Sequence, residues 1–77
     1  MKEFTLEEVS LHDTIEDAWI IINNHVYDIT EFLNEHPGGK NILLKIAGED
    51  ASDYFNELHQ PLILEEYGEK YKIGILI

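Results

Sequence analysis

The stretch His36-Pro37-Gly38-Gly39, followed by a second histidine at His59, decides the fold and the chemistry expected of this 77-residue chain. Proline disfavours a helical conformation for His36, and the two glycines permit positive φ angles and a close approach of the backbone to a bulky group. A phenylalanine lies four positions before each histidine, at Phe32 and Phe55, which is the spacing of one helix face. The pattern predicts an apolar, aromatic-walled slot in which two imidazoles hold one metal centre.

The length and the lack of cysteine also indicate a bound group. Chains below roughly 70 to 80 residues usually need a disulfide, a structural metal or a cofactor to stabilise a small core. Cysteine is absent, so disulfides and thiolate zinc sites are excluded. Ser10 and Ser52 lack the context of a nucleophile elbow, and we expect no enzyme activity.

The charge of the chain excludes some partners and favours others. The formal net charge is −11, and all five basic residues are lysine, so nucleic acid and anionic membrane surfaces are not expected partners. A basic protein partner is expected instead. The acidic residues near the two histidines are either a docking surface or solvated helix faces, and they are Glu31, Glu35, Glu49, Asp50, Asp53 and Glu57.

Local patterns predict a short helix followed by a hairpin. Thr5 and Glu8 form a Thr-x-x-Glu capping box, and Phe4 with Val9 has the spacing of a hydrophobic staple. The runs 19–22 and 25–29 are rich in β-branched and aromatic residues, and the pair Asn23-Asn24 between them tolerates positive φ.

Four further segments complete the predicted α+β fold. Thr30 is expected to cap a helix over 30–35. A helix over 42–47 ends at Gly48, and Asp50 caps the next, over 51–58. Pro61 begins a helix that runs through 62–67, and 71–77 returns to the hairpin as an edge strand. We expect one domain, 1–77, with a small sheet as the floor and short helices as the walls.

In this order the chain resembles the cytochrome b5 haem-binding family over nearly its whole length. The matching segments, in sequence order, are Phe4-Thr-Leu-Glu-Glu-Val9, Trp19-Ile-Ile-Ile22, Val26-Tyr-Asp-Ile-Thr30, Phe32-Leu-Asn-Glu-His-Pro-Gly-Gly39, Ala47-Gly-Glu-Asp-Ala51, Phe55, His59 and Ile73-Gly74. The second histidine comes one residue earlier than in animal microsomal members, because Leu58 stands where those have a glycine. This shorter spacing is similar to that of the haem domains of plant and fungal nitrate reductases.

The resemblance implies a non-covalent b-type haem between the helices of a small mixed-sheet fold. His36 and His59 would be its two axial ligands and the only metal ligands. The residues implied to line the pocket with them are Phe32, Gly38, Gly39, Ile42, Leu43, Phe55 and Leu58. With both axial positions filled by protein, iron has no open site for substrate, so the implied activity is one-electron transfer.

The implied partners are a flavin-type reductase as donor and a basic-faced acceptor such as a desaturase, a hydroxylase or a cytochrome. Related domains dock such partners through carboxylates around the exposed haem edge. No stretch approaches the roughly 18 apolar residues of a membrane-spanning helix. We expect a free-standing monomer without a membrane anchor in this chain, located in the cytoplasm.

Other residues and other functions fit the sequence less well. His12 lies at the expected end of a helix, where a histidine interacts well with the C-terminal carbonyls, and His25 lies in the hairpin. Both are predicted to be structural or solvated. Trp19, Tyr27 and Tyr71 are expected to pack in the core or on the sheet rather than relay electrons. Steroid-binding relatives of the family lack the paired histidines, and zinc would need four compactly spaced ligands.

Overall fold

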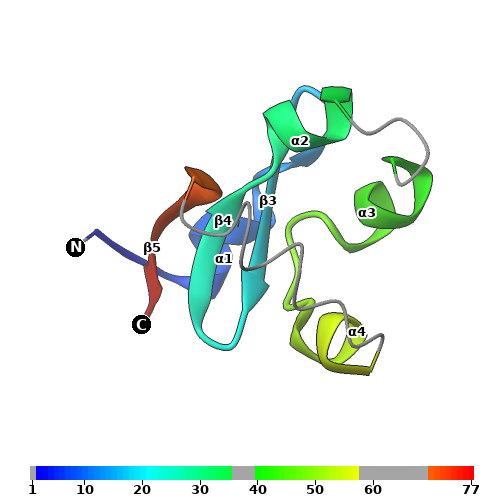
Figure 1. The fold of residues 1–77 in the computed structure, drawn as a ribbon. Helices are drawn as coiled ribbons and strands as arrows, with labels where there is room; N and C mark the ends of the chain where they lie inside the picture. The colour runs from blue at the N-terminus through cyan, green and yellow to red at the C-terminus, as the bar shows by residue number, and fades with distance from the viewer. Residues whose placement is uncertain (1, 36–39, 58–69) are drawn as a thin grey trace.

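A mixed five-stranded sheet with short helices forms the fold, as the sequence predicts (Figure 1). The structure is a computed structural model and describes residues 2–35, 40–57 and 70–77. The strands follow the order β1-β5-β4-β3-β2 across the sheet. In chain order the elements are β1 (Glu3–Phe4), α1 (Leu6–Ser10), β2 (Asp13–Thr14), β3 (Asp17–Ile22), β4 (His25–Asp28), α2 (Thr30–Glu35), α3 (Lys40–Ile46), α4 (Ser52–Glu57) and β5 (Lys72–Leu76).

The predicted capping box begins α1. The backbone N–H of Glu8 donates to Thr5 Oγ1 at 3.1 Å, and the Thr5 N–H donates to Glu8 Oε1 at 3.4 Å. Two N–H groups that the helix itself leaves without acceptors are thereby satisfied. Val9, on the last turn of α1, is fully buried and holds the helix against the sheet.

The predicted hairpin joins β3 to β4. Asn23 and Asn24 have φ angles of 50° and 67°, the left-handed region that a tight two-residue hairpin turn requires. The antiparallel register runs from Ile22 opposite His25 to Trp19 opposite Asp28. The register directs alternate residues of β3 to opposite faces of the sheet.

Both faces of β3 are covered, and each face belongs to a different core. The larger core takes Ala18, Ile20 and Ile22 from β3 and packs them against α2, α3 and α4. The smaller core takes Ile21 with Val9 and Val26, and Phe4, Trp19, Ile73 and Leu76 pack at its margin. The prediction that Trp19 packs in the core or on the sheet is therefore confirmed.

The C-terminal strand pairs with the hairpin as expected, but the prediction that it is an edge strand is wrong. β5 lies between β4, to which it is antiparallel, and β1, to which it is parallel. Glu3 and Phe4, expected only to precede a helix, form the outer strand. β1 covers the edge of β5 at Ile75 and Leu76, so this part of β5 is not free to pair with another chain.

Glycine is required at position 74 of β5. A Cβ atom built there would collide with the backbone carbonyl of Lys2 and lie 2.7 Å from the ring of Phe4. We expect Gly74→Ala to displace β1 and to lower the free energy of unfolding by about 1–3 kcal/mol, measured by urea denaturation. Lys72→Ala on the same strand is the control and should cost less, and an equal loss in both variants would contradict the steric explanation.

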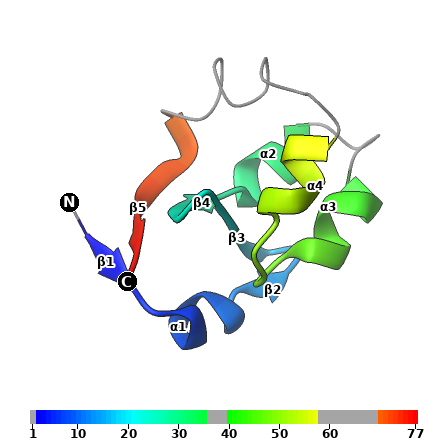
Figure 2. The ribbon, with the colours of Figure 1, turned by 90° about the horizontal axis from the view of Figure 1, so that it is seen from below.

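The connection between α3 and α4 is hydrogen-bonded to β3. The N–H of Gly48 donates to the carbonyl of Trp19 at 2.6 Å, and Ile21 exchanges hydrogen bonds with Glu49 and Ala51 at 3.1 and 2.7 Å. Gly48, with a φ angle of +81°, ends the preceding helix as predicted. Figure 2 shows the result, in which α2, α3 and α4 gather on one side of β3 and α1 lies apart from them.

Candidate functional site

The structure describes two of the nine predicted pocket residues in full, Phe32 on α2 and Leu43 on α3. The backbone of Ile42 lies in α3 and that of Phe55 in α4, but their side chains lie outside the described part. The other five lie outside the described residues, and they are His36, Gly38, Gly39, Leu58 and His59. The helix predicted over 62–67 also lies there.

Phe32 and Leu43 come from different helices and lie in one apolar cluster. Their exposed fractions are 7% and 8%, and both belong to the larger core. The resemblance implies that both line the haem pocket, and the structure buries both in the same apolar cluster. Leu33, beside Phe32 on α2, is fully buried in the same cluster and anchors the helix to the sheet.

Tyr71 supports the ring of Phe32 from the other end of the chain. The two ring centroids are 5.9 Å apart and the planes meet at 77°, an edge-to-face contact that stabilises aromatic pairs. Tyr71 is 6% exposed and belongs to the larger core. The prediction of a packing role for Tyr71 is confirmed, but its contact with Phe32 was not predicted, since no local pattern links the two.

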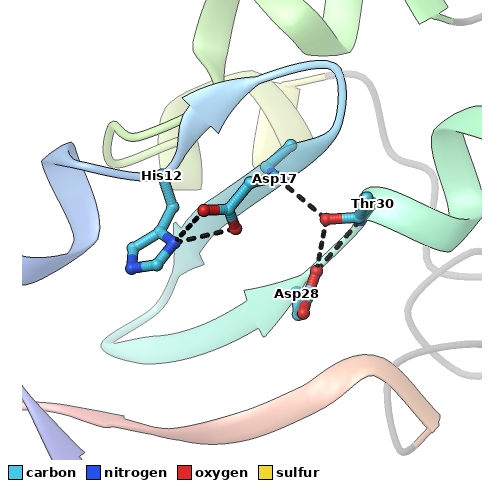
Figure 3. Close-up of polar contacts among 5 residues, drawn as sticks. His12, Asp17, Asp28 and Thr30 are labelled. Atoms are coloured by element: carbon cyan, nitrogen blue, oxygen red, sulfur yellow. Dashed lines mark hydrogen bonds and ion pairs between the residues drawn. The ribbon is translucent and has the colours of Figure 1, made fainter.

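The start of α2 is held by a chain of hydrogen bonds, of which only the involvement of Thr30 was predicted. Thr30 was expected to cap α2, but the Asp28 carboxylate accepts from the Thr30 N–H at 3.1 Å and so takes that role. The Thr30 hydroxyl also donates to Asp28 Oδ1 at 2.7 Å and accepts from the Ala18 N–H at 2.9 Å (Figure 3). The Asp-x-Thr spacing before an apolar helix was the available signal.

The start of α4 is held in a related way, and here the predicted residue is correct. Asp50 Oδ1 accepts from the Ser52 N–H at 2.9 Å and from the Ser52 hydroxyl at 2.5 Å. The same hydroxyl accepts from the N–H of Asn23 at 2.7 Å, which ties α4 to the β3–β4 turn. Ala51 is buried just before the helix, and Tyr54 packs against the larger core.

The described pocket residues, Phe32 and Leu43, are chemically suited to a large apolar group. Among the described residues no polar or charged side chain is buried. The same residues contain no group of three histidine or carboxylate side chains able to hold a metal ion. Buried apolar side chains such as those of Phe32 on α2 and Leu43 on α3 are of the kind that packs against the flat face of a porphyrin.

The described acidic residues of the predicted cluster face solvent. Glu31, Glu49, Asp50 and Asp53 are exposed. Glu31 lies 4.0 Å from the ammonium group of Lys70, and both side chains are more than half exposed, so the pair stabilises the fold little. Exposed carboxylates of this kind are available to a basic partner.

His12 has a structural role, as predicted, but the predicted partner is wrong. Its Nδ1 lies 2.7 and 2.8 Å from the two carboxylate oxygens of Asp17 rather than at the carbonyls of α1 (Figure 3). Its ring stacks on that of Trp19, with centroids 3.5 Å apart and planes 7° from parallel. His25 is the first residue of β4 and is paired with Ile22, which also agrees with a structural role.

We expect His12→Ala to lower the free energy of unfolding by about 1–2 kcal/mol, because it removes an aromatic stack and a partly exposed ion pair. Asp17→Asn keeps the stack and should cost less than His12→Ala. Urea denaturation followed by the fluorescence of Trp19, the one tryptophan of the chain, measures both. Equal losses in the two variants would show that the stack contributes nothing.

Comparison with known proteins agrees with this architecture. Residues 5–77 match the family model described as a cytochrome b5-like haem/steroid-binding domain. The chain is 45% identical over 76 residues to a cytochrome b5 of Drosophila melanogaster, covering 99% of this chain and 57% of that protein. It is 47% identical over 73 residues to a putative cytochrome b5 of Neurospora crassa, covering 95% and 88%. The chain spans little more than half the length of several relatives that it matches.

Solved structures show the same fold. The cytochrome b5 of Ostreococcus tauri virus 2 superposes with a TM-score of 0.84 at 42% identity, covering 95% of this chain and 94% of that one. Cytochrome b558 of Ectothiorhodospira vacuolata, a prokaryotic homologue of cytochrome b5, gives 0.84 at 28% identity and covers 99% of both. The described helices include none long and apolar enough to span a membrane. The sequence, the sheet order and the buried apolar residues on α2 and α3 thus agree, and the chain belongs to the cytochrome b5 family, whose domain is described as haem/steroid-binding.

Proposed function

We propose that residues 1–77 form one haem-binding domain that carries single electrons, with His36 and His59 as the two axial ligands of a b-type haem. The observation that carries the proposal is the meeting of Phe32 and Leu43 in one buried apolar cluster. α2 supplies Phe32 and ends at Glu35, so His36 is the next residue of the chain. Family membership supports the same cofactor.

The residues of this chain have two tasks in that function. Haem supplies the ferric–ferrous couple when it is bound. The imidazoles of His36 and His59 would occupy both axial positions, so that neither oxygen nor a substrate reaches the metal. The remaining predicted pocket residues exclude water, which favours electron transfer without bond-making chemistry, and no enzyme activity is proposed. The absorption spectrum of the purified protein after haem addition, oxidised and then reduced with dithionite, tests the proposal.

The proposed partners are a flavin-type reductase as donor and a basic-faced protein as acceptor. The exposed carboxylates of Glu49, Asp50 and Asp53 support docking of a basic surface. The net charge of −11 would also steer such a partner toward the molecule over distances of about a Debye length. The monomeric state and the cytoplasmic location expected from the sequence stay predictions.

We expect electron transfer to a basic acceptor to slow by roughly tenfold or more as ionic strength rises from about 0.01 M to about 0.3 M, because salt screens steering. Stopped-flow mixing of the reduced protein with cytochrome c, a basic probe, measures the rate. At low salt Asp53→Asn should slow the reaction more than Glu3→Gln, which removes the same charge from β1. A rate that does not depend on salt would contradict docking through the carboxylates.

A further inference from the structure

The hydrogen bonds at Thr30 continue the β3–β4 ladder beyond its last paired residues. The ladder ends with Trp19 opposite Asp28, and Ile29 then donates its N–H to the carbonyl of Ala18 at 2.8 Å. The N–H of Ala18 donates in turn to the hydroxyl oxygen of Thr30 at 2.9 Å. Both backbone groups of Ala18 are therefore bonded to the segment that leads into α2.

The direction of these bonds is fixed by the chemistry of a hydroxyl group. Thr30 Oγ1 accepts a hydrogen bond from the Ala18 N–H, and its own single proton points to the Asp28 carboxylate at 2.7 Å. The same carboxylate oxygen accepts the N–H of Thr30 at 3.1 Å. An N–H, a hydroxyl and a carboxylate in series polarise one another, and bonds to an ionised acceptor are stronger than neutral ones. Figure 3 shows Thr30 held between β3 and Asp28.

Apolar packing in the larger core holds one face of α2. Phe32 and Leu33 are buried in the larger core. Thr30, Glu31 and Asn34 instead line a hollow of about 390 Å³, to which Asp28 and Lys70 also contribute. Tyr71 and Ile73 complete the lining of that hollow. On this face the hydrogen bonds of Thr30 to Ala18 and Asp28 fix the first turn of α2.

We propose that Thr30 is a positioning residue of the haem site: its hydroxyl, held by Ala18 and Asp28, sets where α2 delivers the chain to His36. The inference rests on the proposed function of His36 as an axial ligand. α2 has six residues and a length of about 9 Å, so a shift at its first residue is carried to its last. A displaced helix would leave His36 less well positioned to hold the haem, and the haem would be bound less tightly.

Three variants separate this role from a general loss of stability. Thr30→Val keeps the branched shape and removes the hydroxyl, Thr30→Ser keeps the hydroxyl, and Thr14→Val makes the same chemical change at an exposed residue of β2. Each is loaded with haem, and two quantities are measured: the rate of haem transfer to an excess of apomyoglobin and the high-spin fraction of the ferric absorption spectrum.

Thr30→Val is expected to release haem at least about tenfold faster and to show a high-spin fraction. The rate of haem release from Thr30→Ser should stay within about twofold of that of the unaltered protein. The rate from Thr14→Val should equal that of the unaltered protein. His12→Ala destabilises the other core and should remain low-spin. The proposal would be overturned if Thr30→Val released haem no faster than Thr14→Val. It would also be overturned if His12→Ala had as large a high-spin fraction as Thr30→Val.

Two remaining outcomes are also decisive. If Thr30→Val does not fold, Asp28→Asn takes its place, because it weakens the acceptor and keeps the shape. Faster haem release from that variant supports the proposal, and an unchanged rate overturns it. Failure of the unaltered protein to bind haem would refute the proposed function itself, and that result is visible before any variant is made.

Discussion

Replacing either His36 or His59 with alanine is expected to convert the ferric haem spectrum from low-spin to high-spin, or to abolish haem binding. Two imidazoles produce a strong axial field and a six-coordinate iron, and the loss of one leaves a five-coordinate or water-ligated metal. The effect is large because no other histidine is predicted to serve as the ligand. Absorption spectra of the oxidised and dithionite-reduced proteins measure it.

The chain contains its own controls, since it has four histidines. His12 is held by Asp17 and Trp19, and His25 lies in the β3–β4 hairpin. His12→Ala and His25→Ala should therefore retain the low-spin spectrum. Free imidazole should restore that spectrum in His36→Ala and His59→Ala, because a small ligand can enter the space that the side chain has left. Haem bound identically without His36 or without His59 would show that the ligand assignment is wrong.

The parts of the fold that the sequence predicted correctly are those encoded by local chemistry. The capping box of Thr5 and Glu8 satisfies backbone groups within one turn. The Asn23-Asn24 pair adopts positive φ between two β-branched runs. Gly48 and Asp50 each lie two residues from the helix end that they define. In each case the residues that determine the element are close neighbours in the chain.

The errors concern partners that are distant in the sequence. β1 has only two residues, Glu3–Phe4, too few to show an alternating pattern, and its existence depends on pairing with β5. The predicted edge position of β5 failed for the same reason. His12 was assigned to helix carbonyls because a histidine there commonly binds them, but the Asp17 carboxylate and the Trp19 ring are closer and stronger partners.

The candidate site also combines residues that the sequence predicts with contacts that it does not. Phe32 and Leu43 were predicted from helical spacing and from family resemblance, and the structure buries both in one cluster. The contact of Phe32 with Tyr71 and the bond between Thr30 and Ala18 depend on how β3, β5 and α2 come together. Sequence spacing cannot predict such contacts, because it carries no information on tertiary packing.

Leu33→Ala is expected to have the largest effect on stability outside the haem ligands. Leu33 lies on α2 and is fully buried in the larger core, which also contains Ala18, Ile20 and Ile22 of β3. Truncating a buried leucine removes apolar contacts and leaves a cavity, at a cost of about 2–5 kcal/mol. A domain of this size has a total stability near the lower end of about 5–15 kcal/mol, so without haem the variant should be largely unfolded.

Haem should restore much of that loss, because a ligand that binds only the folded state stabilises it by mass action. At a free concentration 100 times the dissociation constant the gain is about 2.7 kcal/mol. Urea denaturation of Leu33→Ala with and without haem, followed by far-UV circular dichroism, measures both terms. Leu11→Ala is the control, since Leu11 is 77% exposed and should change stability by less than about 0.5 kcal/mol. A loss below about 1 kcal/mol in Leu33→Ala would mean that the larger core does not hold α2, and that Thr30 and Asp28 anchor the helix without it.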